Sequence, residues 1–107
     1  MSRAYKVEVS VKGVAPKALS NLMTKRFGWD QGHLSEYRGM ARFIGDGWLT
    51  GGQSEKEAHE QIYKALKAMN PKALISTQWT YLEEFPYSEY GDDFDADTPL
   101  EEVKHGE

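Results

Sequence analysis

The stretch from residue 5 to residue 12, Tyr-Lys-Val-Glu-Val-Ser-Val-Lys, decides the fold. Its apolar side chains fall on every second position, and polar side chains stand between them: Tyr5, Val7, Val9 and Val11 are the apolar set. This period of two predicts a β-strand with one buried face and one face in water. Gly13 ends the pattern. Because only one face is apolar, the strand requires covering elements on that side alone.

Two segments downstream have apolar residues at helical spacing. Pro16 suits the first turn of a helix, Gly28 is a natural end, and the stripe between them is Ala15, Ala18, Leu19, Leu22, Met23 and Phe27. Ser54 and Glu57 have the spacing of a capping box, which predicts the start of a second helix. Its apolar stripe is Ala58, Ile62, Ala65, Leu66 and Met69, and Asn70 followed by Pro71 ends it.

Further strands are predicted between and after the helices. Residues 30–36 are interpreted as a polar connection, and residues 37–44 and 48–50 as strands. Gly45-Asp46-Gly47 between them has the composition of a hairpin turn. Residues 73–85 form the last β-rich run, which Pro86 is expected to break.

The predicted order is therefore β-α-β-β-α-β. We expect an α+β fold, an antiparallel sheet with two helices on one face, in the split β-α-β or ferredoxin-like arrangement. Right-handed crossovers would place the first and last strands side by side in the middle of the sheet. A layout with another strand order is the alternative. We expect one domain over residues 1–86 and a flexible acidic tail over 87–107, partly disordered from about Asp92.

The composition excludes several classes of protein. The chain has 107 residues and no cysteine, which rules out a disulfide scaffold, a cysteine-ligated zinc site and a thiol nucleophile. No apolar run reaches the roughly 18 residues that a membrane span needs, and the N-terminus has no apolar signal-peptide core. We expect a cytoplasmic protein that does not bind membranes.

The net charge of -4 conceals an asymmetry. Residues 1–80 hold 12 basic and 7 acidic side chains, for a net charge of +5. Residues 81–107 hold one basic and 10 acidic side chains, for a net charge of -9. The sequence thus predicts a mildly basic body followed by a strongly acidic tail.

Three partial motifs fail at the residues that carry their chemistry. Gly47 to Ser54 nearly matches a phosphate-binding loop, but Gln53 stands where the lysine is needed. His59-Glu60 begins like a zinc metalloprotease helix, but Tyr63 replaces the second histidine, so we expect His59 to be a solvated helix residue. The alternating aspartates from Asp93 lack the glycine and glutamate of a calcium loop. The sequence predicts no metal, no cofactor and no catalytic set, so we expect a protein that is not an enzyme.

The most unusual segment interleaves aromatic and acidic residues near the C-terminus. Aromatic anchors offer large contact area and the acids offer electrostatic steering. We expect a non-enzymatic interaction module, an inhibitor or adaptor that covers a basic partner surface by mimicking nucleic acid. Alternatively, these rings fold back onto the basic body. The expected binding residues are Tyr81, Glu83, Glu84, Phe85, Tyr87, Glu89, Tyr90, Asp92, Asp93 and Phe94.

Two other functions remain open at this point. The basic body could bind nucleic acid, with an autoinhibitory acidic tail, through Lys25, Arg26, Arg38 and Arg42. A small-ligand protein or enzyme could use the Gly45–Gly52 segment or the sheet face as a pocket. Edge strands and exposed aromatics also permit a homodimer.

Overall fold

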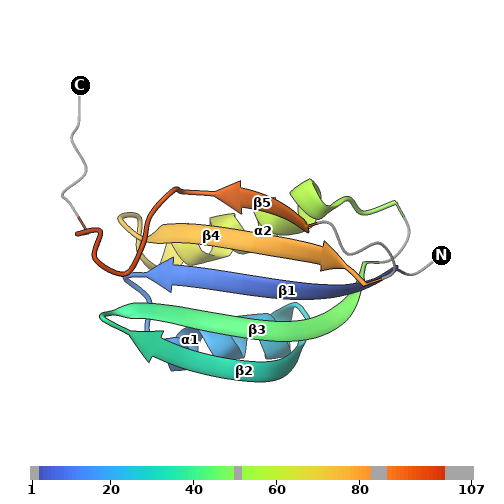
Figure 1. Cartoon of the computed structure of the whole chain (residues 1–107), viewed down its shortest axis with the longest axis horizontal. Helices are drawn as coiled ribbons and strands as arrows, with labels where there is room; N and C mark the ends of the chain where they lie inside the picture. Colours follow the sequence, from blue (N-terminus) through green and yellow to red (C-terminus); the bar gives the residue numbers. More distant parts are fainter. Residues whose placement is uncertain (1–2, 50–51, 83–86, 101–107) are drawn as a thin grey trace.

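Strand β1 (Arg3–Lys12) lies at the centre of a five-stranded antiparallel sheet with helices on one face only (Figure 1). The computed structural model describes residues 3–49, 52–82 and 87–100. The side chains of Tyr5, Val7, Val9 and Val11 are buried beneath the helices, as the alternation predicted. The polar positions between them face the opposite side, which no described helix covers and which we call the open face of the sheet.

The helices begin and end where the sequence predicted, with one local difference. Helix α1 (Pro16–Asn21) continues into a turn of π-helix, η1 (Leu22–Arg26), and Gly28 follows with a φ of 76°. Helix α2 (Glu55–Met69) starts at the capping box that Ser54 and Glu57 form. Helix α1 covers the β2–β3 side of the sheet and α2 covers the β4–β5 side (Figure 1).

The predicted hairpin turn is in the wrong place. Strands β2 (Asp30–Tyr37) and β3 (Met40–Leu49) are joined at Arg38 and Gly39, whose φ angles of 54° and 81° make the tight turn. The predicted polar connection over residues 30–36 is in fact the edge strand β2, which is largely exposed and therefore carries no apolar alternation.

Gly45 and Gly47 lie inside strand β3 instead of in a turn. A Cβ atom on Gly47 would stand 2.4 Å from Cε3 of Trp29, and one on Gly45 would stand 2.6 Å from Cε1 of Phe43. The Asp30 carbonyl oxygen would stand nearer still to a Cβ atom on Gly45, at 2.4 Å, so the two glycines are required by aromatic rings and by the backbone of β2. Their turn-like composition reflects close packing and not a reversal of the chain.

The predicted four-stranded β-α-β-β-α-β fold class is also wrong. Strand β4 (Leu74–Tyr81) pairs with β1, as expected of the first and last predicted strands, but a fifth strand, β5 (Tyr87–Gly91), pairs with its other edge. The sheet order is β2-β3-β1-β4-β5. Five strands with two helices differ from the ferredoxin-like layout. The predicted flexible tail is wrong for residues 87–91, since they form β5. The sequence did not reveal this strand, because a short half-polar edge strand after a proline gives almost no periodic signal.

Beyond β5 the chain turns back across one end of the sheet. The Lys12 ammonium donates to the Ala96 carbonyl, and Arg38 forms an ion pair with Asp97. Asp95 accepts hydrogen bonds from the Asp97 N–H at 3.0 Å and the Thr98 hydroxyl at 3.1 Å. None of the helices that the structure describes has the length and hydrophobicity to cross a membrane.

Candidate functional site

The outer strand β5 presents an aromatic and an acidic side chain on the open face. Tyr87 lies opposite Thr80 of β4, and Glu89 lies opposite Gln78. Tyr87 is 58% exposed, and Glu89 is exposed as well. Both were predicted binding residues, and the alternation of the strand places them side by side on one surface.

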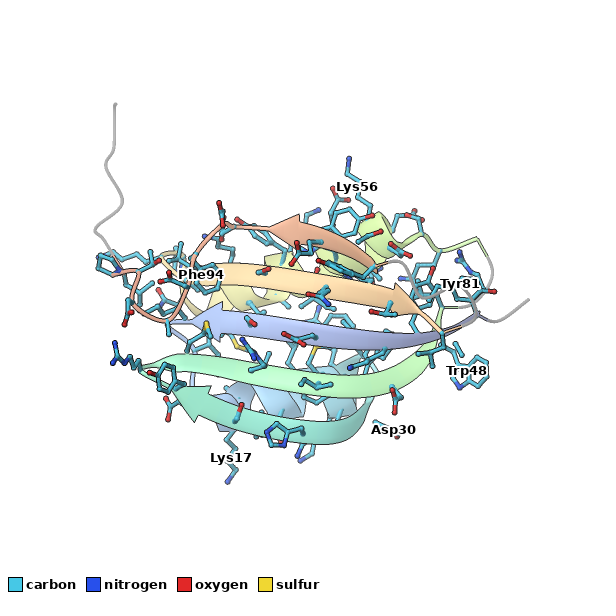
Figure 2. All side chains as sticks on the ribbon, viewed as in Figure 1. Lys17, Asp30, Trp48, Lys56, Tyr81 and Phe94 are labelled. Carbon is cyan, nitrogen blue, oxygen red and sulfur yellow. The ribbon has the colours of Figure 1, made fainter. Side chains whose placement is uncertain are left out.

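Trp48 extends this surface, and the sequence interpretation missed it. Its side chain is 64% exposed, and Figure 2 shows it at the end of the sheet, pointing away from the molecule. Trp48 lies opposite Ala4 of β1, and the N–H of Leu82 donates to the Ala4 carbonyl from the other side at 3.1 Å. Only a small alanine therefore separates the exposed Trp48 and Leu82. We name the group Trp48, Leu82, Tyr87, Asp46 and Glu89 the aromatic-acidic face.

A sequence signal for Trp48 exists once β3 is treated as one strand. Phe43 and Leu49 are buried, and both stand at odd-numbered positions of the strand. Because side chains alternate along a strand, the even-numbered Trp48 must face the open side. The misplaced turn at residues 45–47 interrupted this alternation and hid the exposed position.

The remaining predicted aromatic residues contribute more to packing. Tyr81 stacks on Tyr5 with ring centroids 5.3 Å apart, and Tyr90 stacks on His59 at 5.4 Å. Phe94 is half-buried and lines a concavity on the open face with a volume of about 450 Å³. Glu83, Glu84 and Phe85 lie outside the described residues.

The predicted acids also divide between two roles. Glu89 and Asp93 are exposed and form no ion pair with any residue that the structure describes. The Asp92 carboxylate instead accepts a hydrogen bond from the Ile75 N–H at 2.9 Å, and the Asp92 N–H donates to the Ile75 carbonyl at 2.7 Å. Asp92 thereby fastens the end of β5 to β4.

The four basic residues of the nucleic-acid alternative are not brought together. Lys25 and Arg26 lie on η1, on the helical side of the molecule. Arg38 pairs with Asp97, and the Nε atom of Arg42 lies 3.5 Å from a Glu8 carboxylate oxygen on the open face. The structure thus gives no continuous basic surface from these four positions.

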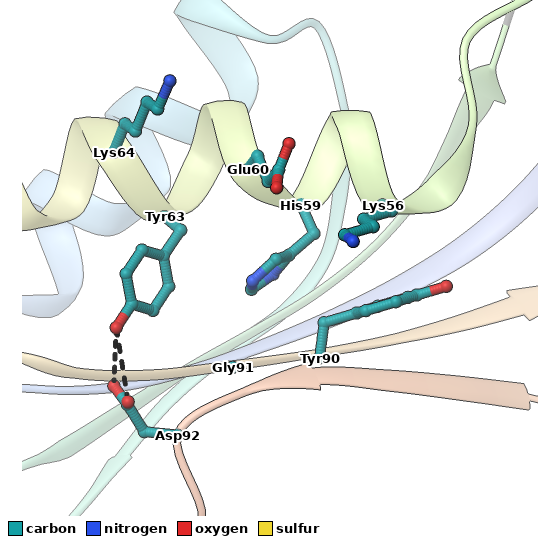
Figure 3. Close-up of a pocket in the computed structure, with 8 residues that line it drawn as sticks. All are labelled: Lys56, His59, Glu60, Tyr63, Lys64, Tyr90, Gly91 and Asp92. Carbon is teal, nitrogen blue, oxygen red and sulfur yellow. Dashed lines mark hydrogen bonds between the residues drawn. The ribbon is translucent and has the colours of Figure 1, made fainter.

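A second site is a groove between α2 and β5, on the side opposite the open face (Figure 3). It has a volume of about 500 Å³, and its floor is formed by the imidazole of His59. His59 is only 7% exposed, so the prediction of a solvated histidine is wrong. Its lining residues are Lys56, His59, Glu60, Tyr63, Lys64, Tyr90, Gly91 and Asp92.

A buried hydrogen-bond chain fixes the histidine. The Trp79 indole N–H donates to the Thr77 Oγ1 at 2.8 Å, and the same oxygen lies 2.8 Å from Nδ1 of His59. Burial lowers the pKa of His59, and it outweighs the opposite effect of the Glu60 and Asp92 carboxylates. The neutral ring satisfies all three groups when Thr77 donates to Nδ1, which places the ring hydrogen on Nε2.

Tyr63 forms one wall of the groove. Its hydroxyl donates to the Asp92 carboxylate, 3.3 Å from Oδ1 and 3.5 Å from Oδ2 (Figure 3). Burial raises the pKa of Tyr63, and the Asp92 charge and this hydrogen bond add to the effect. Tyr63 therefore stays a neutral hydrogen-bond donor and is not activated as a nucleophile.

The described residues contain no group of three or more His, Cys, Asp and Glu side chains placed to hold a metal ion. Comparisons with protein-family models, with curated proteins and with solved structures find no match.

Proposed function

We propose that this protein is a non-catalytic interaction module whose aromatic-acidic face binds a basic surface of a partner protein, of the kind that also binds nucleic acid. The observation that carries the proposal is the exposure of Trp48 and Tyr87 on the face that also holds Asp46 and Glu89. Neither acid forms an ion pair with a described residue, although Lys6 lies beside Asp46 on β1. Tryptophan and tyrosine are enriched among the residues that dominate binding energy.

The charge of the C-terminal segment supports a basic partner. Residues 87–100 contain five acidic side chains and no basic one. Exposed acids around an aromatic centre accelerate encounter with a basic surface and disfavour acidic competitors. They add little to the stability of the complex by themselves, so the aromatic contacts must supply most of the affinity.

Strand pairing of β5 also supports the proposal. The ladder between β4 and β5 holds Tyr87 and Glu89 at fixed positions before any partner arrives. A preorganised anchor loses little conformational freedom on binding, whereas a structureless arm would lose much more.

The test begins with affinity capture from the source cells and identification of the captured proteins. The affinity of the purified partner is then measured for Trp48→Ser and Tyr87→Ser. We expect each change to weaken binding about tenfold or more, equivalent to ~1.4 kcal/mol. Binding should also weaken as salt rises from about 50 to about 300 mM.

The chain offers a matched control in Tyr37→Ser. Tyr37 is 61% exposed, and its pairing with Met40 places it on the open face at the far end of the sheet. This change should leave the affinity unaltered. If Trp48→Ser and Tyr87→Ser bind the same partners as tightly as the Tyr37 variant does, the proposed surface is wrong.

A further inference from the structure

The groove between α2 and β5 carries polar, aromatic and charged side chains that the proposed function does not use. Tyr90 and Glu89 are neighbours on β5 and point to opposite sides, so the groove lies across the sheet from the aromatic-acidic face. Its volume of about 500 Å³ lies within the range of small-molecule sites. An occupant of the groove would therefore not compete with a partner on the open face.

The floor of the groove supplies a hydrogen-bond donor. Thr77 occupies Nδ1 of His59, so the Nε2–H is the ring group left for a ligand. The residue as a whole is only 7% exposed. No described protein atom accepts a hydrogen bond from Nε2. The Nε2–H therefore faces the space of the groove, where an acceptor atom on a ligand can replace water.

The walls supply planar surfaces and an acceptor. The rings of Tyr63 and Tyr90 lie on either side of His59 (Figure 3), each with its centroid 5.4 Å from the imidazole centroid. Half-buried tyrosines are the side chains on which aromatic heterocycles stack. Beside Tyr63, the Asp92 carboxylate can accept a hydrogen bond from a ring amino group.

The rim supplies positive charge. Lys56 and Lys64 are exposed on α2 at the mouth of the groove, and neither forms an ion pair with a described carboxylate. Glu60 stands between them and keeps the mouth from attracting simple anions strongly. An anionic group must therefore be attached to a body that the groove itself holds.

We propose that this groove binds a small planar heteroaromatic anion of the mononucleotide kind. Its ring lies against Tyr63 and Tyr90, with an acceptor on His59 Nε2–H and an amino group toward Asp92. Its phosphate meets Lys56 or Lys64. This set of one donor, one acceptor, aromatic walls and cations matches the chemistry of a nucleotide, whereas a purely apolar ligand would leave the polar groups unpaired.

Titration of the full isotope-labelled chain with AMP, GMP, CMP and UMP, each followed by NMR, tests the proposal. The Trp79 indole N–H reports on the floor, because Thr77 links it to His59. We expect at least one nucleotide to shift this signal saturably, with a dissociation constant below about 1 mM. Inorganic phosphate and ribose 5-phosphate at the same concentrations should not reproduce the shift.

The double variant Lys56→Gln with Lys64→Gln should weaken nucleotide binding about fivefold, since it removes both rim charges. The matched control, Lys17→Gln with Lys25→Gln, removes two exposed lysines of α1 and η1 and should bind as the unchanged chain does. No saturable shift with any nucleotide, an equal shift with phosphate alone, or unchanged binding by the Lys56 and Lys64 variant would overturn the proposal. These outcomes are independent of partner binding by Trp48 and Tyr87.

Discussion

The hydroxyl of Thr77 is a fully buried polar group with two side-chain partners. It accepts from Trp79 and lies within hydrogen-bond distance of His59, both at 2.8 Å, and Thr77 has no exposed surface. One oxygen thus joins the centre of β4 to helix α2. Because buried polar groups are costly when unpaired, the two partners depend on this single atom.

Thr77→Val keeps the shape of the side chain and removes the hydroxyl. The Trp79 N–H and His59 Nδ1 then remain buried without a partner, and we expect a loss of about 2 to 4 kcal/mol in unfolding free energy. Urea unfolding followed by tryptophan fluorescence measures it. Thr80→Val, a half-buried position on the open face of the same strand, should cost less than about 1 kcal/mol. Equal losses of unfolding free energy in the two variants would contradict the stabilising role of the hydrogen bonds to Thr77.

Individual candidate residues could be identified from the sequence only where they belong to a local compositional pattern. Tyr87 and Glu89 were singled out as candidates because an aromatic residue beside acids is a local feature, and the structure places both side chains exposed on one face. His59 was misjudged, because its burial depends on β5 and Tyr90 lying over it, and no local pattern carries that information. A histidine on a helix next to Glu60 and one turn after Lys56 is expected to be solvated until the neighbouring strand is known.

At the level of elements, strand β5 is held by few contacts. It has five paired positions with β4 and nothing on its outer edge among the described residues. The two hydrogen bonds between Asp92 and Ile75 close its end, and Gly91 before them has a φ of 107°. Gly91 is required there, because a Cβ atom would stand 2.2 Å from the Ile75 carbonyl oxygen.

Asp92→Ala should loosen β5 while the rest of the sheet stays intact. The Ile75 N–H and the Tyr63 hydroxyl both lose their acceptor, and we expect a loss of about 1 to 2 kcal/mol for local opening of the strand. Hydrogen exchange of the β5 amides should accelerate about tenfold, whereas exchange in β1 should not change. Asp93→Ala, at an exposed neighbouring carboxylate, is the control and should leave β5 exchange as it is.

Elements with strong periodicity were predictable and the two edge strands were not. Strand β1 and helix α2 each bury one regular face. The apolar alternation of the strand and the apolar stripe of the helix can therefore be recognised in the sequence. Strand β2 is exposed on most positions and β5 is short, so neither has an apolar period. Their existence depends on the free edges of β3 and β4, which is a tertiary property.

At the level of the whole molecule, buried titratable groups limit the pH range of stability. The folded state lowers the pKa of His59 below its ordinary 6.5 because of burial, so below that pH the unfolded chain binds a proton that the native protein does not. The stability linked to His59 is therefore fully present above pH 6.5 and is lost as the pH falls from 6.5 through the folded pKa. Burial raises the pKa of Tyr5 from 10.0 to about 12, so stability also falls between these values as the pH rises.

The loss of stability at acid pH can be assigned to His59 by measuring the unfolding free energy between pH 5 and pH 8. His59 contributes a slope of at most about 1.4 kcal/mol per pH unit. His59→Gln should flatten the profile, because glutamine does not titrate. His33→Gln, at an exposed histidine of β2, is the matched control variant. A profile that His59→Gln leaves unchanged would show that other groups cause the acid loss.

The C-terminal segment is part of the sheet, so its removal should affect the whole molecule. A chain ending at Pro86 loses β5, leaves the outer edge of β4 unpaired, and uncovers the His59 ring that Tyr90 stacks on. An unpaired strand edge is a template for association with another chain. We expect this truncation to unfold at lower urea concentration than the full chain and to form oligomers in light scattering after gel filtration.

A chain ending at Leu100 keeps β5 and the Asp97 ion pair, and it should remain monomeric if the full chain is. Should the shorter chain match the longer one in both measurements, β5 would be an appendage of the sheet and not a component of its stability. Point variants at Trp48 and Tyr87 are therefore the cleaner test of partner binding, because they leave this strand in place.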